Sequence, residues 1–175
     1  MRHQIAHVQL VDPADIPRFA ELGVTATIQA AWAVNDADMT ELTTPLLGAQ
    51  RAQRQYPFRS LREAGAPLAA GSDWPVSGAD PLLAAHVAVN RSEPGTDQEP
   101  FAARESLLLS DILAAYTVGS ARVNNLHERI GQAQVGMDAD LVVLDRDPFS
   151  LPEREIGNTQ VDLTLARGRV VHERT

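Results

Sequence analysis

The chain has 175 residues, of which 44% are hydrophobic and 22% charged, and it contains no cysteine. These proportions are typical of a globular protein with one core, or one core and a small appendage, and they exclude thiolate chemistry from this chain. The formal net charge of -8 opposes nucleic-acid binding, because a protein that neutralises phosphates needs a basic face. All 15 basic residues are arginine, so the chain supplies no Schiff-base, phosphate-loop or carbamylated lysine.

Membrane association is also opposed by the sequence. No run approaches the ~20 apolar residues that a membrane-spanning helix needs, and the N-terminal Met1–Gln4 is not followed by the apolar stretch of a secretion signal. A leader that had been removed would leave no trace here. We therefore expect a cytoplasmic protein that binds neither membranes nor nucleic acid.

The first part of the chain alternates between strand and helix patterns. The apolar run Ile5–Leu10 is followed by Asp12 and Pro13, which suit the start of a helix, and Gly23 ends that helix before the β-branched run Val24–Gln29. The pattern predicts strands at 5–10, 24–29 and 68–70, helices at about 14–22, 46–55, 58–64 and 81–91, a helix capped by Ser110-Asp111 that runs to about 124, an irregular segment at 30–44 and a loop at 92–100. This order is typical of an α/β fold.

The C-terminal part changes character. A strand is predicted at 139–145, and two further strands at 161–166 and 170–173 flank Arg167-Gly168 as a hairpin. Antiparallel strands after a series of βα units indicate a small separate β layer. We therefore divide the chain into residues 1–128 and residues 129–175.

One acidic residue lies where α/β enzymes place catalytic or metal-binding groups. Asp73 belongs to the glycine-containing segment Gly71–Pro75, directly after the predicted strand 68–70. An acid in such a turn can instead bond to its own backbone, so both readings of Asp73 stay open.

Four segments form a recognisable set: 2–7 (Arg-His-Gln-Ile-Ala-His), 71–75 (Gly-Ser-Asp-Trp-Pro), 116–122 (Tyr-Thr-Val-Gly-Ser-Ala-Arg) and 136–145, which ends Ala-Asp-Leu-Val-Val-Leu-Asp. Taken together, they resemble the metal-dependent amidohydrolase superfamily, and within it the family 3 branch that includes N-substituted formamide deformylases. The resemblance implies a (β/α)8 barrel with an added β-sandwich, in proteins roughly three times as long as this chain. It places the predicted strands 5–10, 24–29 and 68–70 at barrel strands six, seven and eight, and residues 129–175 in the sandwich.

The same resemblance implies roles for two residues. His7 would be a metal ligand, and Asp73 would both bind metal and accept the proton of the attacking water. Neutral imidazole and carboxylate suit a divalent metal, of which we expect zinc, and such a metal lowers the pKa of bound water toward neutrality. The other reading of His7 is a buried strand histidine.

The remaining ligands of the family pattern have no counterpart in this chain. The pattern draws them from a His-x-His on strand one, a histidine on strand five and a lysine or its equivalent on strand four. His3 does not replace them, because residues four apart on a strand lie about 13 Å apart at ~3.3 Å per residue. We therefore expect the chain to resemble the C-terminal third of such an enzyme, to bind no metal tightly and to be inactive alone.

Further residues are candidates of lower rank. Gln29, Trp32 and Trp74 lie at or just past the ends of predicted strands, which predicts substrate-lining roles for them. Core packing explains the two tryptophans equally well. His86, on the helix after strand 68–70, could face the barrel mouth or be packed. The rest are expected to be structural or solvated: His3 at a strand entry, His127, His172, Asp36 and Asp38 at the surface, and Arg122 as an ion-pair partner of Asp80 or Asp111.

Three functional readings follow. The first is a metal-dependent hydrolase of non-peptide C–N bonds, of amide or formamide type, that acts on a small molecule once the rest of the barrel is present. The second is a non-catalytic fragment that forms a homodimer or a larger assembly, because three barrel strands leave two open sheet edges. The third is an acidic binding module based on segment 30–44.

Overall fold

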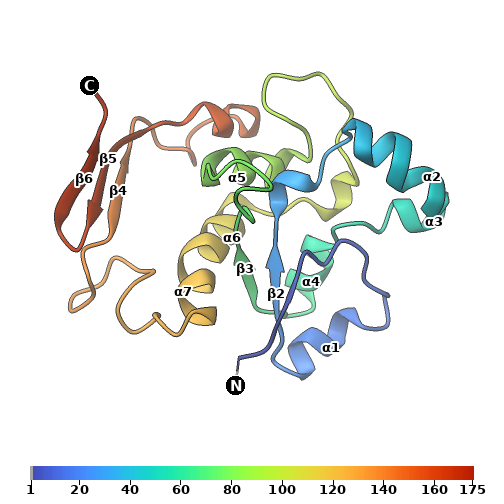
Figure 1. The fold of residues 1–175 in the computed structure, drawn as a ribbon, viewed down its shortest axis with the longest axis horizontal. Helices are drawn as coiled ribbons and strands as arrows, with labels where there is room; N and C mark the ends of the chain where they lie inside the picture. Colours follow the sequence, from blue (N-terminus) through green and yellow to red (C-terminus); the bar gives the residue numbers. More distant parts are fainter. Residues whose placement is uncertain (1) are drawn as a thin grey trace.

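A parallel three-stranded sheet runs through the body of the molecule (Figure 1). The structure is a computed structural model that describes residues 2–175. The strands are β1 (Gln4–Ala6), β2 (Thr25–Ile28) and β3 (Leu68–Ala70), in the order β1-β2-β3. Helices lie between them, so the α/β prediction is confirmed.

The first strand is shorter than the predicted run 5–10. It ends at Ala6 because His7 and Val8 have φ angles of 69° and 42°, which take the backbone into the left-handed region and out of the strand. Helix α1 (Ile16–Glu21) and β2 follow as expected, with Gly23 at φ 63° between them.

Segment 30–44 is more ordered than its sequence indicates. A 3₁₀ turn covers Ala30–Trp32, and a π-helical segment covers Asp38–Thr43. The helix predicted at 46–55 is instead two short helices, α2 (Thr44–Leu47) and α3 (Ala49–Ala52). Gly48 separates them because its φ of 74° and ψ of 156° are incompatible with a continuous helix.

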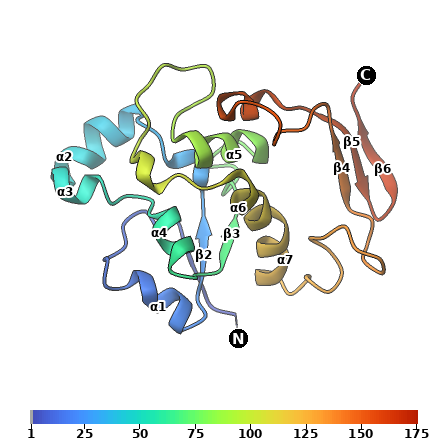
Figure 2. The ribbon, with the colours of Figure 1, turned by 180° about the vertical axis from the view of Figure 1, so that it is seen from behind.

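The helices of the middle of the chain pack against the sheet. They are α4 (Phe58–Glu63), α5 (Pro81–Asn90), α6 (Leu109–Ala114) and α7 (Ser120–Val123), with a π-helical segment at Ala115–Gly119 that joins the last two and a 3₁₀ turn at Ala103–Glu105. The π-helical segment and α7 contact β3, and α7 lies beside β3 in the view from behind (Figure 2). The predicted cap of this last helix is wrong: the helix begins at Leu109, which places Ser110 and Asp111 inside its first turn.

The core lies between the parallel sheet and these helices. Ile28, Phe58, Leu61 and Ile112 are completely buried, and α5 is buried along most of its length. Asp80 caps α5, its side chain accepting hydrogen bonds from the backbone N–H groups of Leu82 and Leu83. Among the described residues, no helix is long and apolar enough to cross a membrane.

A second, antiparallel sheet lies to one side of the body (Figure 1). It contains β4 (Leu141–Leu144), β5 (Val161–Ala166) and β6 (Arg169–Glu173), and the hairpin predicted at Arg167-Gly168 is confirmed. Between β4 and β5, a 3₁₀ segment at Glu153–Asn158 returns to α5 and places Ile156 in the core. The division of the chain at residue 128 stays a prediction.

Candidate active site

The carboxyl ends of the three parallel strands lie level with one another. Ala6 pairs with Thr27, and Ile28 pairs with Ala70. Beyond the strands, the His7 N–H donates to the Thr27 carbonyl at 2.9 Å, and the Gly71 N–H donates to the Ile28 carbonyl at 3.1 Å. Since neighbouring strands are ~4.8 Å apart, His7 and the segment that carries Asp73 leave the sheet about 10 Å from each other, one on each side of β2.

The His7 ring is held by two residues that follow β2. Its Nδ1 lies 2.9 Å from Oε1 of Gln29, and the same oxygen is 3.1 Å from the His7 backbone nitrogen. The ring also stacks on Trp32, with 5.2 Å between ring centroids and 24° between planes. His7 itself is exposed, so the alternative of a buried strand histidine does not describe its position.

Gln29 and Trp32 therefore contact His7, the candidate metal ligand, directly. Gln29 is 5% exposed and Trp32 is half-buried. Both residues follow β2, as predicted, but the contact between Gln29 and His7 was not predicted. The contact could have been predicted from strand pairing: when adjacent parallel strands end at the same level, the residues that follow them become neighbours. Their substrate-lining roles stay a prediction.

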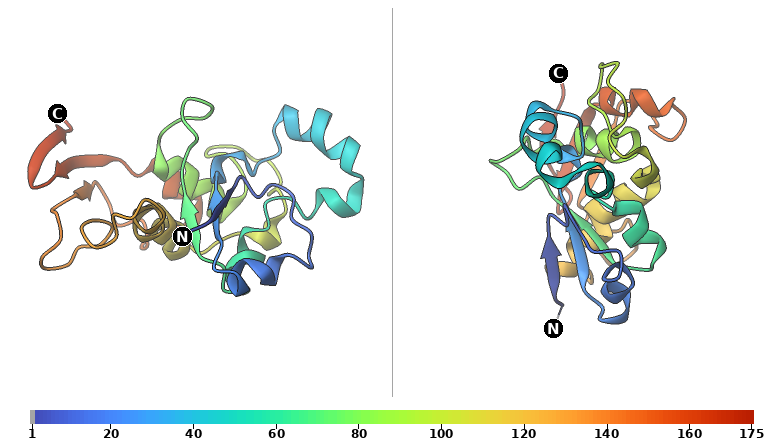
Figure 3. Two further views of the ribbon diagram at one scale, coloured as in Figure 1. Left: turned by 60° about the horizontal axis from the view of Figure 1, so that its bottom comes forward. Right: turned by 90° about the vertical axis from the view of Figure 1, so that its right-hand side faces the viewer.

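Asp73 lies in a loop that stands out from the carboxyl end of β3 (Figure 3). Its backbone is left-handed, at φ 56°, a conformation that Asp tolerates better than most residues, and its carbonyl accepts a hydrogen bond from the Val76 N–H at 2.8 Å. Within residues 2–175, no hydrogen bond or ion pair involves the Asp73 carboxylate, so the acid is not used to close its own turn. The carboxylate is exposed at the same sheet edge as His7.

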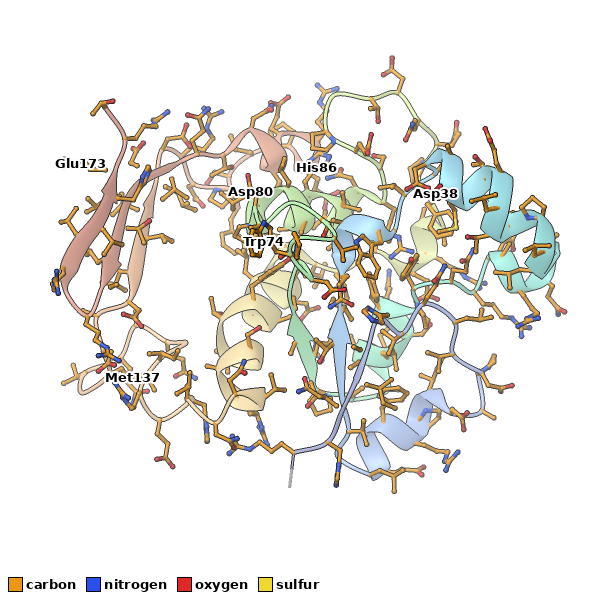
Figure 4. All side chains as sticks on the ribbon, viewed as in Figure 1. Asp38, Trp74, Asp80, His86, Met137 and Glu173 are labelled. Carbon is orange, nitrogen blue, oxygen red and sulfur yellow. The ribbon has the colours of Figure 1, made fainter. Side chains whose placement is uncertain are left out.

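Trp74 is 71% exposed in the same loop and lies near the upper ends of the strands (Figure 4). This exposure excludes core packing as the explanation of Trp74. A substrate-lining role for it stays a prediction.

His86 is buried within α5 and is 2% exposed. Its Nδ1 accepts a hydrogen bond from the Gly157 N–H at 3.2 Å, so the ring holds the C-terminal 3₁₀ segment against α5. Burial lowers the pKa of His86, and the nearby Glu155 opposes this effect. These surroundings favour the packed alternative over a place at the barrel mouth.

Most of the residues that were expected to be structural or solvated lie at the surface, as predicted. His3 and His172 are exposed, Asp38 is exposed, and Asp36 accepts a hydrogen bond from the Met39 N–H at 2.7 Å. His127 is not simply solvated, because both of its ring nitrogens lie within 3.2 Å of the Arg2 guanidinium.

The ion pair expected for Arg122 is wrong. Asp111 pairs with Arg62 at 2.9 Å instead, and Asp80 caps α5. Arg62 lies on α4 and Asp111 on α6, so this ion pair links the two helices.

The donor chemistry of His7 and Asp73 fits zinc, but their number does not. Within the part of the chain that the structure describes, no three His, Cys, Asp or Glu side chains come together as a metal would require. A catalytic zinc takes three protein ligands, so these residues form at most part of a metal site.

Comparison with known protein families shows the family of the chain. Residues 1–172 match the model of the amidohydrolase family. The chain belongs to this family. It is 35% identical over 149 residues to Protein LONG AFTER FAR-RED 3 of Arabidopsis thaliana, a match that covers 85% of this chain and 25% of that protein. It is 26% identical over 173 residues to the N-substituted formamide deformylase of Arthrobacter pascens, covering 98% of this chain and 31% of that protein.

A solved structure agrees with this assignment. An uncharacterised metal-dependent hydrolase from Pyrococcus horikoshii OT3 superposes with a TM-score of 0.72 and is 31% identical, over 86% of this chain and 30% of that chain. This amidohydrolase chain thus spans about a quarter to a third of the lengths of these relatives.

Proposed function

We propose that the chain carries part of the active site of a metal-dependent hydrolase that acts on C–N bonds other than peptide bonds, with an amide or formamide of a small molecule as substrate. In this proposal β1, β2 and β3 are strands six to eight of a (β/α)8 barrel, residues 1–128 belong to that barrel, and residues 129–175 belong to the sandwich. The remaining metal ligands come from sequence beyond this chain.

One observation carries the proposal: an imidazole and an unpaired carboxylate occupy the same carboxyl edge of a parallel sheet, in a chain that matches the amidohydrolase family over residues 1–172. This edge is where barrel enzymes hold their catalytic groups. The similarity to an N-substituted formamide deformylase supports the C–N bond and the formamide class.

The roles follow from the chemistry of the two side chains. His7, as a neutral imidazole, and Asp73, as a carboxylate, would each contribute one ligand to the metal. A metal bound there would supply a water of lowered pKa and would polarise the substrate carbonyl. Asp73 would accept the proton of the water that attacks that carbonyl and pass it to the leaving nitrogen, which the exposure of its carboxylate permits.

The test compares two purified proteins: the 175-residue chain and the product of the longest reading frame that contains it. Bound zinc is measured by elemental analysis, and hydrolysis is assayed on N-formyl and simple amide substrates. We expect stoichiometric metal and turnover in the longer product, a loss of turnover of at least ~100-fold in its Asp73→Asn variant, and neither metal nor turnover in the short chain.

Asp97→Asn is the matched control, because Asp97 is also an exposed loop acid but lies in the loop at 92–100. It should keep full turnover. A longer product that binds no metal, or an Asp73→Asn variant that turns over normally, would contradict the proposed function.

A second candidate function, self-association without catalysis, is favoured by the open edge of β1. All three residues of β1 are exposed, and a cavity of about 460 Å³ flanks the strand, lined in large part by apolar side chains such as Ile5, Phe19 and Leu22. Unpaired strand edges of this kind bind further strands. Light scattering on the 175-residue chain tests this candidate, which predicts a dimer or larger particle that Ile5→Lys reduces to a monomer; a monomeric unmodified chain contradicts it.

A further inference from the structure

The hydrogen bonds around Gln29 fix which nitrogen of His7 carries a proton. The side-chain atom of Gln29 that faces His7 lies 3.1 Å from the His7 backbone nitrogen, which is a donor. This N–H also donates to the Thr27 carbonyl at 2.9 Å, so it is shared between two partners, and the second partner must be an acceptor as well. The oxygen is the acceptor of a glutamine side chain. The amide orientation follows from this contact alone, without reference to the imidazole.

That oxygen also lies 2.9 Å from Nδ1 of His7. Because the oxygen can only accept, Nδ1 must be the donor, and in a neutral imidazole the other nitrogen, Nε2, then carries the lone pair. Within residues 2–175, no hydrogen bond engages Nε2. The ring plane is fixed as well, by the stack of Trp32 on His7.

We propose that Gln29 is a positioning residue that holds His7 in the Nδ1–H tautomer and presents the unprotonated Nε2 as an electron-pair donor. Gln29 contacts both the backbone nitrogen and the ring of His7. These two contacts support a positioning role for Gln29 rather than a substrate-lining one. Gln29 is 5% exposed, so water does not compete strongly for its oxygen. The use of Nε2 as a metal ligand rests on the proposed function, whereas the tautomer does not.

The tautomer can be measured in the 175-residue chain itself. Two-bond ¹H–¹⁵N correlation spectra of the imidazole rings distinguish a protonated from an unprotonated nitrogen, and His7→Asn identifies the His7 signals by their loss. The spectra are recorded in mildly alkaline buffer. We expect Nδ1 of His7 to be protonated and Nε2 to be unprotonated.

Three variants test the cause. Gln29→Leu removes the acceptor at similar volume and should shift the proton of His7 toward Nε2, whereas Gln29→Glu keeps an acceptor at the same place and should retain Nδ1–H. Gln53→Leu, at an exposed glutamine without contact to His7, should leave the spectrum unchanged. In the longer reading-frame product, Gln29→Leu should weaken zinc binding about 10- to 100-fold, the usual effect of removing a partner of a ligating histidine, and Gln29→Glu should not.

The inference is overturned if Nε2 of His7 carries the proton in the unmodified chain, or if a folded Gln29→Leu chain keeps Nδ1–H. Should Gln29→Leu fail to fold, the unmodified chain and Gln29→Glu still decide the matter, because both must show Nδ1–H. If the longer product proves to have no hydrolase activity, the proposed function fails while the spectra still test Gln29.

Discussion

Gly119 lies so close to Leu68 that a Cβ added to it would be 2.1 Å from the Leu68 carbonyl oxygen. The helix formed by α6, the π-helical segment and α7 therefore approaches β3 backbone to backbone. The next residue strengthens the approach, since the Ser120 hydroxyl donates to the Ala70 carbonyl at 2.8 Å. This contact fixes the helix to the strand that leads into the loop of Asp73.

Gly119→Ala should destabilise the protein by about 3 kcal/mol, because the obstacle is backbone and cannot rotate away. The sign is informative, since glycine to alanine within a helix ordinarily stabilises by up to about 1 kcal/mol. Urea unfolding followed by circular dichroism measures the change. Gly78→Ala is the control: an added Cβ there meets nothing within 4 Å, and its effect should stay within about 0.5 kcal/mol. A neutral or stabilising Gly119→Ala would contradict the close approach.

His86 should make stability depend on pH. Burial lowers its pKa in the folded state below the ordinary 6.5, so between these two values the unfolded chain binds more protons than the folded one. The contribution of His86 to the free energy of unfolding is therefore fully present above about pH 6.5, and it is lost as the pH falls toward the pKa of His86 in the folded state. Protonation of Nδ1 would also remove the acceptor of the Gly157 N–H.

The measurement is the free energy of unfolding between pH 5 and 8 in the unmodified chain and in His86→Gln. The variant should show a weaker decline on acidification, and His172→Gln, at an exposed histidine of β6, should behave like the unmodified chain. Identical pH profiles for His86→Gln and the unmodified chain would exclude this role of His86.

Arg91 should be required for the core, although it is a charged residue with no exposed surface. Its guanidinium donates to the backbone carbonyls of Phe101, Tyr56 and Gln55 at 2.8, 3.3 and 3.4 Å, and lies 5.2 Å from the ring centroid of Phe58. Burial lowers its pKa to about 10, which still leaves it charged at neutral pH.

Arg91→Met keeps much of the volume but removes the guanidinium donor from three buried carbonyls, of which that of Tyr56 still accepts from the Phe58 N–H at 2.8 Å. We expect a loss of about 3 kcal/mol of unfolding free energy. Arg54→Met is the comparison, because no hydrogen bond or ion pair of the Arg54 side chain occurs within residues 2–175. Thermal or urea unfolding of both variants gives the difference. Equal, small losses in the two would show that the carbonyl contacts of Arg91 contribute little.

The order of strands and helices could be predicted from the sequence because local signals determine it. Gly23 and Gly65 end helices at positive φ, and the β-branched run at 24–28 is buried in the sheet, so α1, β2, α4 and β3 lie close to their predicted positions. The early end of β1 was not predicted, because the left-handed backbone of His7 and Val8 has no sequence signature: a β-branched residue such as Val8 seldom adopts it.

The candidate site was predictable as a set of residues but not as a set of contacts. Asp73 and His7 were predicted from strand patterns and from a family resemblance, both of which can be recognised in short stretches of sequence. The contact of Gln29 with His7 depends on the register of β1 against β2, and the burial of Arg91 depends on carbonyls that are 10 to 36 residues away. Such relationships arise only when distant segments pack, so no local pattern predicts them.

The cap of α5 provides the last prediction, because Asp80 both ends the loop of Asp73 and begins the helix of His86. Its carboxylate accepts hydrogen bonds from the Leu82 and Leu83 N–H groups at 2.8 and 3.4 Å. Asp80→Ala removes both acceptors and should cost about 1 kcal/mol of unfolding free energy, whereas Asp80→Asn keeps an accepting oxygen and should cost much less. Urea unfolding of the two variants measures the gap. If alanine and asparagine had equal effects, the hydrogen bonds of the cap would not be what stabilises the start of α5.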